Sequence, residues 1–304
     1  MGTRHLNNAL ALGNEVTTVD PLGGDFSSLE AALIGRYDAA VIASPSHLHA
    51  EHATQCLNAG IATLCEKPLA SRHVDAVSLM GLAISRGVLA MVAQSYRYHR
   101  GINLLKERMS DAYIGKVGYI GTPLMVNYFS GQHLSQWYPD RDYKEMYVSR
   151  REQGGGIQLT SLTHQLDTIR YLFGEITTLN GKASNSRTLG IDVEDMAVMS
   201  GRTTTKTFFT ASSDFLQREN THRITVVGTH GEGTLDLAHG IMGCTWKWSN
   251  GDEMEMIHLG PCDDRYRLEL EDFLAVVRGG KPNPIPLSEG CINMNLIEKY
   301  VILV

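Results

Sequence analysis

The stretch that decides the fold is "DAAVIASPSHLHAEHATQCLNAGIATLCEKPLA", residues 38–70. It holds two short apolar runs, "DAAVIAS" (38–44) and "IATLCE" (61–66), with a helical segment between them that closes on Gly60. A buried strand, a helix and a second buried strand are typical of a unit whose two strands run parallel. Ligands of such sheets bind at the carboxyl ends of the strands, so the "EKP" that follows the second run marks a candidate site.

The same alternation continues on both sides of this stretch. Apolar runs at 15–20 ("EVTTVD") and 88–94 ("VLAMVAQ") are each separated from their neighbours by helical sequence. This spacing predicts a doubly wound parallel α/β sheet over residues 1–98.

Beyond about residue 115 the apolar runs become longer and alternate with polar residues, which is typical of antiparallel strands. We predict a second, α+β domain over residues 99–304, with a large and mostly antiparallel sheet and two closing helices. The segments on which this rests are "VGYIGTPLMVNYF" (117–129), "DMAVMSG" (195–201), "KTFFTASSDF" (206–215), "HRITVVG" (222–228), "GTLDLA" (233–238), "CTWKWSN" (244–250), "RYRLELEDFLAVVRG" (265–279) and "EGCINMNLIEKYV" (289–301).

Composition limits the classes of function. The 304 residues are 43% hydrophobic and 20% charged, enough to bury a sizeable core in two domains. A net charge of −6 disfavours nucleic acid and membrane surfaces as partners and leaves small neutral or anionic metabolites. No apolar run approaches a membrane span and no leader opens the chain, so we expect a cytoplasmic protein. The five cysteines show neither CxxC spacing nor nearby histidine pairs, so we expect them to be reduced and mostly structural, and we expect no metal site.

The chain opens with "MGTRHLNNALALG" (1–13), which reads as a helix that ends at a glycine. If Gly2 is the third glycine of a GxGxxG turn, Asp20 lies close to the roughly 20-residue offset at which an acidic side chain binds the adenosine ribose of a dinucleotide. Asp20 also begins the sequence "DPLGG", so a purely structural role at a turn is the alternative.

A second motif is "GGGIQLTSLTHQLDTIRYLFG", residues 154–174. At about 100° per residue, Thr160, His164, Asp167 and Tyr171 share one stripe of a helix, opposite a cluster of apolar side chains. His164 can exchange a proton near neutral pH, and Asp167, one turn later, can orient the imidazole or bind a substrate. The alternative is a solvated helix face with an incidental histidine.

The two motifs together resemble the Gfo/Idh/MocA oxidoreductase family, through its Glu66-Lys67-Pro68 triplet and its glycine-rich segment before a histidine-bearing helix. The resemblance covers nearly the whole chain. It implies a Rossmann domain that binds NAD(P), followed by a substrate-binding and oligomerisation domain. The N-terminus resembles a family member that begins inside the dinucleotide loop, without its first strand and first two glycines.

The resemblance also implies roles for individual residues. Lys67 contacts the substrate hydroxyl and the cofactor, and His164 is the acid/base residue, with Asp167 and Thr160 fixing the substrate. Many family members carry an aspartate where this chain has Thr160, and a hydroxyl cannot hold the negative charge that raises the basicity of a neighbour. The residues expected at the cofactor are Gly2, Asp20, Ser44, Pro45, His49, Glu66, Lys67 and Gln94.

Four further residues are expected to bind the substrate: Arg97, Trp137, Tyr143 and Lys144. The last three lie in the segment 133–156, which resembles a subgroup associated with surface-polysaccharide or amino-sugar metabolism, and an oligomer contact is the alternative.

The expected activity is hydride transfer between a nicotinamide and a carbinol carbon of a sugar, polyol or amino-sugar derivative. NAD is expected rather than NADP because the Asp20 carboxylate repels a 2′-phosphate. Two alternatives remain: an NAD-dependent glycosidase of the same family, and a non-catalytic sensor or truncated pseudoenzyme. The resemblance also implies a homo-oligomer, a dimer or a tetramer.

Overall fold

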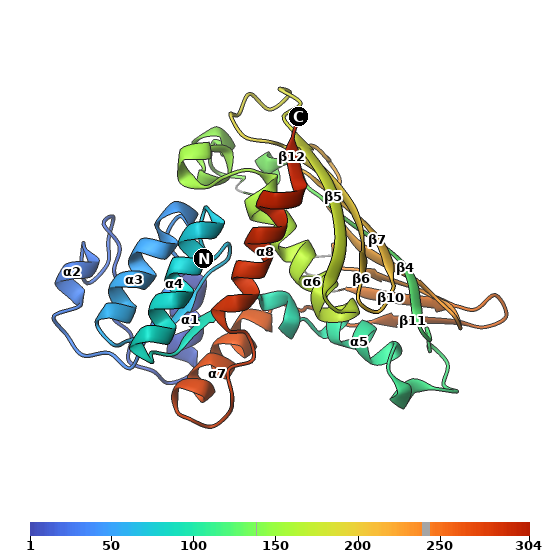
Figure 1. Cartoon of the computed structure of the whole chain (residues 1–304), viewed down its shortest axis with the longest axis horizontal. Coiled ribbons are helices and arrows are strands. Elements are labelled where there is room, and N and C mark those ends of the chain that lie inside the picture. Colours follow the sequence, from blue (N-terminus) through green and yellow to red (C-terminus); the bar gives the residue numbers. More distant parts are fainter. Residues whose placement is uncertain (138, 239–243) are drawn as a thin grey trace. The chain divides into compact units, whose positions relative to one another are not determined.

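The computed structural model describes residues 1–137, 139–238 and 244–304 (Figure 1). The chain divides into two compact units. Unit 1 consists of Met1–Ser95 and Tyr266–Asn295, and unit 2 consists of Tyr96–Arg265 and Leu296–Val304. The first stretch of unit 1 ends close to the domain boundary expected at residue 98, but residues 266–295 group with unit 1 and not with the second domain.

Unit 1 is built on a three-stranded parallel sheet of β1 (Ala39–Ile42), β2 (Ala62–Cys65) and β3 (Ala90–Val92), in that order. These are three of the apolar runs that the sequence predicts as parallel strands. The helices of this part of the chain are α1 (Gly2–Ala11), α2 (Leu29–Ala32), α3 (His49–Asn58) and α4 (His73–Arg86). Gly87 closes α4 in the left-handed conformation, at φ 64°, as its position after the helical run predicts.

The strand expected at residues 15–20 is wrong. The segment forms only an isolated bridge between Val19 and Phe26. The backbone N–H of Asp20 donates to the Phe26 carbonyl, and the N–H of Phe26 donates to the Thr18 carbonyl. Because these backbone groups are satisfied locally, the segment has less need of a neighbouring strand.

The last two helices, α7 (Arg265–Val277) and α8 (Leu287–Tyr300), explain why residues 266–295 belong to unit 1. The segment between them bonds to β3: the N–H of Val92 donates to the Ile285 carbonyl, and the Asn283 amide donates to the Ala90 carbonyl. In α8, a Cβ at Gly290 would lie 2.9 Å from the Leu69 Cβ, so this close approach needs glycine. Local sequence patterns predict these helices but not the long-range contacts that return them to the first sheet.

Unit 2 is built on a nine-stranded sheet in the order β11-β10-β9-β8-β4-β7-β6-β5-β12. Neighbouring strands of this described sheet are antiparallel except for β4 with β7 and β5 with β12, so the expected mostly antiparallel sheet is confirmed. Its strands are β4 (Pro123–Gly131), β5 (Ile176–Ser184), β6 (Met196–Thr203), β7 (Phe208–Asp214), β8 (Thr221–Gly228), β9 (Glu232–Asp236), β10 (Thr245–Ser249), β11 (Met254–His258) and β12 (Val301–Leu303).

The two faces of this sheet differ in burial. Alternate residues of the central strands, such as Val126, Tyr128 and Phe209, are buried on one face of the sheet. Unit 2 also contains the helices α5 (Arg100–Arg108) and α6 (Thr163–Phe173). Gln165 of α6 donates to the Ser212 carbonyl of β7, which places α6 against the sheet.

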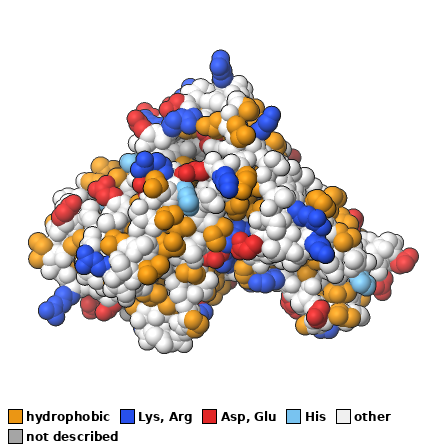
Figure 2. Space-filling view, in the orientation of Figure 1, with side chains coloured by type: hydrophobic (Ala, Val, Ile, Leu, Met, Phe, Trp, Pro, Cys, Tyr) orange, Lys and Arg blue, Asp and Glu red, His pale blue; other side chains and the backbone are white. Residues whose placement is uncertain are grey.

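The register puts the exposed residues of neighbouring strands side by side on the other, open face, where Met125 pairs with Phe208 and Lys247 pairs with Met256. This open face therefore mixes large apolar side chains with polar ones. On the face of the molecule shown in Figure 2, acidic and basic side chains are interspersed and do not gather by sign. In the part of the chain that is described, no helix has the length and hydropathy needed to cross a bilayer.

Candidate functional site

The carboxyl ends of the three parallel strands of unit 1 are aligned. Ile42 pairs with Cys65, and Cys65 pairs with Val92. The pairing continues past the strands, because the N–H of Glu66 donates to the Ile42 carbonyl at 2.9 Å and that of Ala93 donates to the Cys65 carbonyl at 2.8 Å. The candidate residues that follow the three strands, Ser44, Glu66, Lys67 and Gln94, therefore lie along one edge of the sheet.

Glu66 is buried and paired with a histidine of the first helix. His5 Nε2 lies 2.8 Å from Glu66 Oε1, and both side chains are almost fully buried. Burial alone would raise the pKa of Glu66, but the hydrogen bond from His5 and the positive charges of His5 and Lys67 outweigh it and hold the pKa below its usual 4.5. Glu66 is thus ionised at neutral pH.

This pair predicts an acid-dependent loss of stability. Because the pKa of Glu66 is lower in the folded chain than in the unfolded chain, its ionised form stabilises the fold above about pH 4.5, and this contribution disappears as the pH falls through the lowered pKa. Urea unfolding of Glu66→Gln should show a deficit in unfolding free energy at pH 7 that shrinks toward pH 3. The exposed Glu30 provides the control. Glu30→Gln leaves the pair of His5 and Glu66 intact, so it should not reproduce the loss of unfolding free energy at pH 7 that Glu66→Gln shows. A Glu66→Gln deficit of equal size at both pH values would contradict the assignment.

Lys67 follows Glu66 and precedes Pro68 through a cis peptide bond. Its backbone N–H donates to Glu66 Oε2 at 3.2 Å. Burial lowers the pKa of the Lys67 ammonium below 10.5, and the negative charge of Glu66 offsets part of that effect. The result is a lysine whose proton is held less tightly than that of an exposed lysine.

His49 ties two of the strand ends together. Its Nδ1 lies 2.7 Å from the carbonyl oxygen of Pro68, and its Nε2 lies 2.9 Å from that of Ser44. The His49 side chain is 2% exposed and therefore belongs to the interior of unit 1. Burial lowers the pKa of His49, against the two carbonyl hydrogen bonds and Glu66, which raise it. His49 therefore fixes the loops after β1 and β2 relative to one another.

The remaining cofactor candidates are placed as follows. Gly2 begins α1, and a Cβ at this position would meet open space. Asp20 is exposed and accepts the N–H of Leu22 through Oδ1 at 2.8 Å, so it does begin the turn that the alternative interpretation expected. Pro45 is exposed after β1, and Gln94 is 2% exposed after β3.

In unit 2, the glycine-rich motif shapes the approach to the helix that carries His164. Gly156 has a φ of 101°, and a Cβ there would lie 2.3 Å from Glu194 Oε1, so only glycine fits. Residues 158–162 then form a π turn before α6 begins at Thr163. The regular geometry that placed Thr160 on the stripe of His164 therefore does not hold across this turn. Thr160 is buried and donates its hydroxyl to the Gly156 carbonyl at 2.7 Å.

Asp167 lies in a bidentate ion pair with Arg97. Arg97 Nε and Nη2 donate to the two carboxylate oxygens of Asp167 at 2.9 and 2.7 Å, and the Asp167 side chain is 1% exposed. The Arg97 guanidinium also lies 5.5 Å from the centroid of Tyr171. The structure thus brings together Arg97 and Asp167, which the sequence analysis expected to bind or fix the substrate, and places Tyr171 of the same helix stripe beside them.

A chain of aromatic and imidazole groups adjoins His164, and the sequence analysis missed it. Tyr96 packs edge to face with His164, with ring centroids 4.8 Å apart. The Tyr96 hydroxyl lies 3.4 Å from His222 Nδ1, and the Tyr128 hydroxyl lies 2.9 Å from His222 Nε2. The only sequence signal was that Tyr96 directly precedes Arg97, whereas nothing local distinguishes His222 within its strand.

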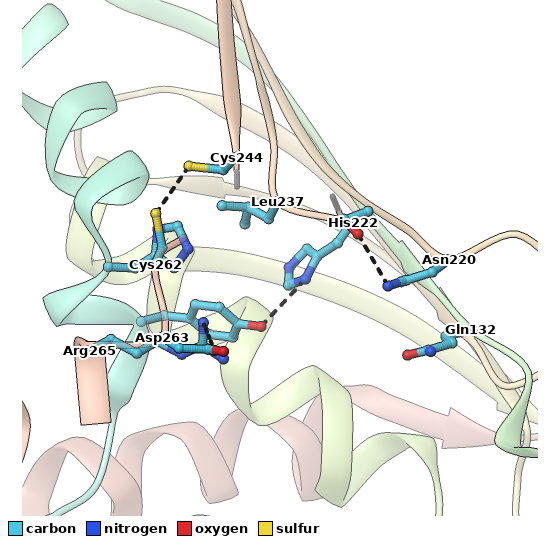
Figure 3. Close-up of a pocket in the computed structure, with 11 residues that line it drawn as sticks. Gln132, Asn220, His222, Leu237, Cys244, Cys262, Asp263 and Arg265 are labelled. Atoms are coloured by element: carbon cyan, nitrogen blue, oxygen red, sulfur yellow. Dashed lines mark hydrogen bonds and ion pairs between the residues drawn. The ribbon is translucent and has the colours of Figure 1, made fainter. Parts of the chain in front are cut away.

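A polar cavity of about 270 Å³ opens beside this chain (Figure 3). Its described lining consists of Tyr96, His99, Gln132, Asn220, His222, Leu237, Ala238, Cys244, Cys262, Asp263 and Arg265. Burial lowers the pKa of His222 to about 4 and that of His99 to about 3, in both cases with help from the positive charge of Arg265. Both imidazoles are neutral at pH 7, so the cavity offers uncharged hydrogen-bonding groups together with the guanidinium of Arg265 and the carboxylate of Asp263, which lie 4.0 Å apart.

The other substrate candidates lie elsewhere in unit 2. Trp137 packs edge to face on the buried Phe215, with centroids 5.3 Å apart. The Tyr143 hydroxyl donates to the Leu189 carbonyl at 3.1 Å, and Lys144 is exposed next to Gly190. None of the three is among the described residues that line the cavity.

Comparison with known proteins covers both units. A model of the oxidoreductase family's NAD-binding Rossmann fold matches residues 3–94, and a model of the C-terminal alpha/beta domain of the same family, Gfo/Idh/MocA, matches residues 106–301.

Similar curated proteins and solved structures span most or part of the chain. A 2,7-anhydro-N-acetylneuraminate hydratase of Mediterraneibacter gnavus is 24% identical over 284 residues, which are 90% of this chain and 72% of that protein. A levoglucosan dehydrogenase of Pseudarthrobacter phenanthrenivorans is 30% identical over 144 residues, 47% of this chain and 35% of that protein. A solved levoglucosan dehydrogenase in complex with NADH and levoglucosan has a TM-score of 0.75 at 21% identity, covering 98% of this chain and 84% of that one. At that identity the structural match shows a shared fold.

Proposed function

The chain belongs to the Gfo/Idh/MocA oxidoreductase family, and from this we propose that it transfers a hydride between NAD and a carbinol carbon of a sugar or sugar derivative. The observation that carries the proposal is the aligned strand edge of unit 1, where Glu66 and Lys67 follow β2 between the ends of β1 and β3. Among relatives named for their activity are a levoglucosan dehydrogenase and a 1,5-anhydro-D-fructose reductase, both sugar oxidoreductases.

The residues at this edge suit the nicotinamide half of the cofactor. When bound, NAD supplies the hydride acceptor or donor. Ser44, Glu66 and Gln94 offer hydrogen-bonding groups at the carboxyl ends of three parallel strands, where dinucleotides bind in such sheets. Glu66 is held in place by His5, and the loop of Lys67 and Pro68 is held by His49. An exposed carboxylate at Asp20 favours NAD over NADP.

We assign the proton chemistry to Lys67 and His164. An ammonium beside the reacting oxygen stabilises the developing alkoxide, and because burial lowers the pKa of Lys67 the ammonium also donates its proton more readily to that oxygen. His164 accepts the hydroxyl proton on oxidation and returns it on reduction. Asp167 lies one turn after His164 on α6, and its bidentate ion pair with Arg97 holds that part of the helix in place. Thr160 takes the place of the family's aspartate, and its hydroxyl is engaged with the Gly156 carbonyl.

The cavity of unit 2 provides the place for the sugar. Its volume of about 270 Å³ suits a single sugar ring, and Gln132, Asn220 and His222 offer hydrogen bonds to hydroxyl groups. Tyr96 lies both on the cavity wall and against His164. The guanidinium of Arg265 and the carboxylate of Asp263 add one charge of each sign to the lining and can both bind sugar hydroxyl groups.

The direct test is a screen of neutral and acidic sugars with NAD and the purified chain, followed by NADH absorbance and by product analysis. The expected result is NADH formation with at least one sugar and a new carbonyl group in the product. Binding of NAD and sugar without turnover would contradict the proposal and favour the sensor or pseudoenzyme.

One relative supports a second candidate function. The hydratase that matches 90% of this chain is named for adding water to an anhydro sugar, a reaction without net redox change. An NAD-dependent enzyme that oxidises, eliminates, adds water and reduces again would release product with no accumulation of NADH. The same screen separates this from dehydrogenation, because product then forms without a change in NADH absorbance.

We also propose that the chain forms a homo-oligomer through the open face of the nine-stranded sheet. Phe208, 58% exposed, and Val198, 59% exposed, contribute apolar area to that face. Phe208→Asp should shift the mass measured by light scattering toward that of a monomer, because it would bury a charge at the contact. The matched variant is Leu22→Asp, an exposed apolar residue of unit 1 outside this sheet, which should leave the mass unchanged. A native chain that is already monomeric would contradict this proposal.

A further inference from the structure

Three metal-ligating side chains from distant parts of the chain meet at one wall of the cavity. They are His99, Cys244 and Cys262, and one potential ligand atom from each lies within 4.8 Å of the others. All three side chains are buried, and the two sulfur atoms are 3.4 Å apart. Figure 3 shows the two cysteines facing one another on the cavity wall. The sequence analysis expected no metal site because it judged spacing along the chain, and these residues come together only in the fold.

The backbone around the cluster holds it in place. Cys244 and Cys262 flank the hairpin of β10 and β11, where the Leu259 N–H donates to the Cys244 carbonyl at 2.9 Å. His99 is the N-cap of α5, and its Nδ1 accepts the N–H of Gly101 at 3.1 Å. A Cβ at Gly101 would lie 3.0 Å from Cys244 Sγ, so glycine is what lets this sulfur approach the start of the helix. Two rigid elements therefore fix the three ligands.

The ligand set selects a class of metal. Two thiolates and a neutral imidazole suit zinc and other thiophilic ions, and zinc–sulfur bonds of about 2.3 Å in tetrahedral geometry place two sulfurs about 3.8 Å apart. The observed separation of the two sulfur atoms, 3.4 Å, is close to this distance. A disulfide would involve only the two cysteines, whereas a metal site also uses the imidazole of His99. Three protein ligands leave a fourth coordination position, as in zinc sites that bind water or a substrate.

We propose that His99, Cys244 and Cys262 bind one zinc ion, with its fourth position open to the cavity. Binding releases one proton from each thiol, and the imidazole exchanges its hydrogen bond with Gly101 for the metal. Two thiolates neutralise the ion's charge, so the loaded site adds no net positive charge beside Arg265. An oxygen donor in the cavity, water or a hydroxyl group of a small molecule, completes the coordination.

The test is a titration of the reduced, metal-free chain with Co²⁺, followed by competition with Zn²⁺. We expect one ion per chain and the near-ultraviolet absorption of thiolate-to-cobalt charge transfer, which zinc abolishes. Cys262→Ser should weaken binding at least about 100-fold, more than the loss of an outer-shell partner usually does. The matched control is Cys56→Ser, which changes a buried cysteine of α3 in unit 1 and should bind the metal as the native chain does.

A variant of the third ligand separates metal binding from helix capping. His99→Asn keeps a side-chain oxygen that can cap α5 but removes the imidazole, so it should fold and bind cobalt weakly. X-ray absorption of the zinc-loaded native chain gives a reading that needs no variant, with two sulfur neighbours and one nitrogen neighbour expected. The proposal is overturned if the native chain shows no charge-transfer band, if Cys262→Ser binds as tightly as the native chain, or if zinc has only oxygen neighbours. A native chain whose two cysteines form a disulfide under the reducing conditions of the test overturns it as well.

Discussion

Turnover should fall at least about 10²-fold when either Lys67 or His164 is replaced by alanine, while the circular dichroism spectrum should be unchanged. Lys67→Ala removes the ammonium that stabilises the alkoxide, and His164→Ala removes the group that takes the hydroxyl proton. Steady-state kinetics with the sugar identified by the screen give the measurement. The expected loss is in kcat, because both groups act on charge that develops during the reaction and not on the bound sugar alone.

The pH profile separates the two roles. Burial lowers the pKa of Lys67, so raising the pH deprotonates it before an exposed lysine and removes the positive charge that the reaction needs. The activity of the native enzyme should therefore decline as the pH rises, and the decline should begin at a lower pH than the ordinary lysine pKa of 10.5 would give. Lys67→Ala should lack this alkaline decline.

Two controls test whether the effect is specific to these positions. Lys247 and His258 are exposed residues of β10 and β11, and their alanine variants should turn over at the native rate. Near-native turnover of Lys67→Ala or of His164→Ala would remove that residue from the proposed chemistry, even if the family assignment of the chain stands.

Asp167→Asn should lower the free energy of unfolding by about 3 to 5 kcal/mol, the range expected when one partner of a buried ion pair is removed. Asp167 is 1% exposed and Arg97 is 13% exposed in this bidentate pair, so the variant leaves a guanidinium with little access to water that has lost its bidentate carboxylate. Urea denaturation of the native chain and the variant gives the measurement.

The chain offers a matched pair on the surface. Arg72, the N-cap of α4, and Asp75 in its first turn form a bidentate pair with distances of 2.8 Å, but their side chains are 69% and 36% exposed. Asp75→Asn should therefore cost less than about 1 kcal/mol. The double variant Arg97→Met with Asp167→Leu should be more stable than Asp167→Asn, because it removes both charges of the buried pair together. Equal costs for Asp167→Asn and Asp75→Asn would show that burial of the first pair does not matter.

Much of the fold was predictable because its signals are local. The apolar runs that became β1, β2 and β3, and the glycines after α3 and α4, are visible within a few residues, and so is the position of Glu66 and Lys67 at the end of a strand. The strand expected at 15–20 failed for the same reason: its apolar pattern is local, whereas a strand exists only with a partner.

The parts that were missed depend on contacts between distant residues. No local pattern pairs His5 with Glu66 or returns α7 and α8 to the first sheet. The π turn before α6 likewise follows from packing around Gly156 and Glu194, so a regular helix projection misplaced Thr160. Cys244 and Cys262 looked like scattered core cysteines because only the hairpin between them brings the sulfurs together.

The low pKa values of His99 and His222 have a practical consequence for any assay. Both rings are uncharged at neutral and alkaline pH, so the protonation state of these imidazoles is the same throughout that range. Protonation of these two histidines therefore does not change ligand affinity at the cavity between neutral and alkaline pH. A change in rate over neutral and alkaline pH therefore does not come from protonation of these two imidazoles.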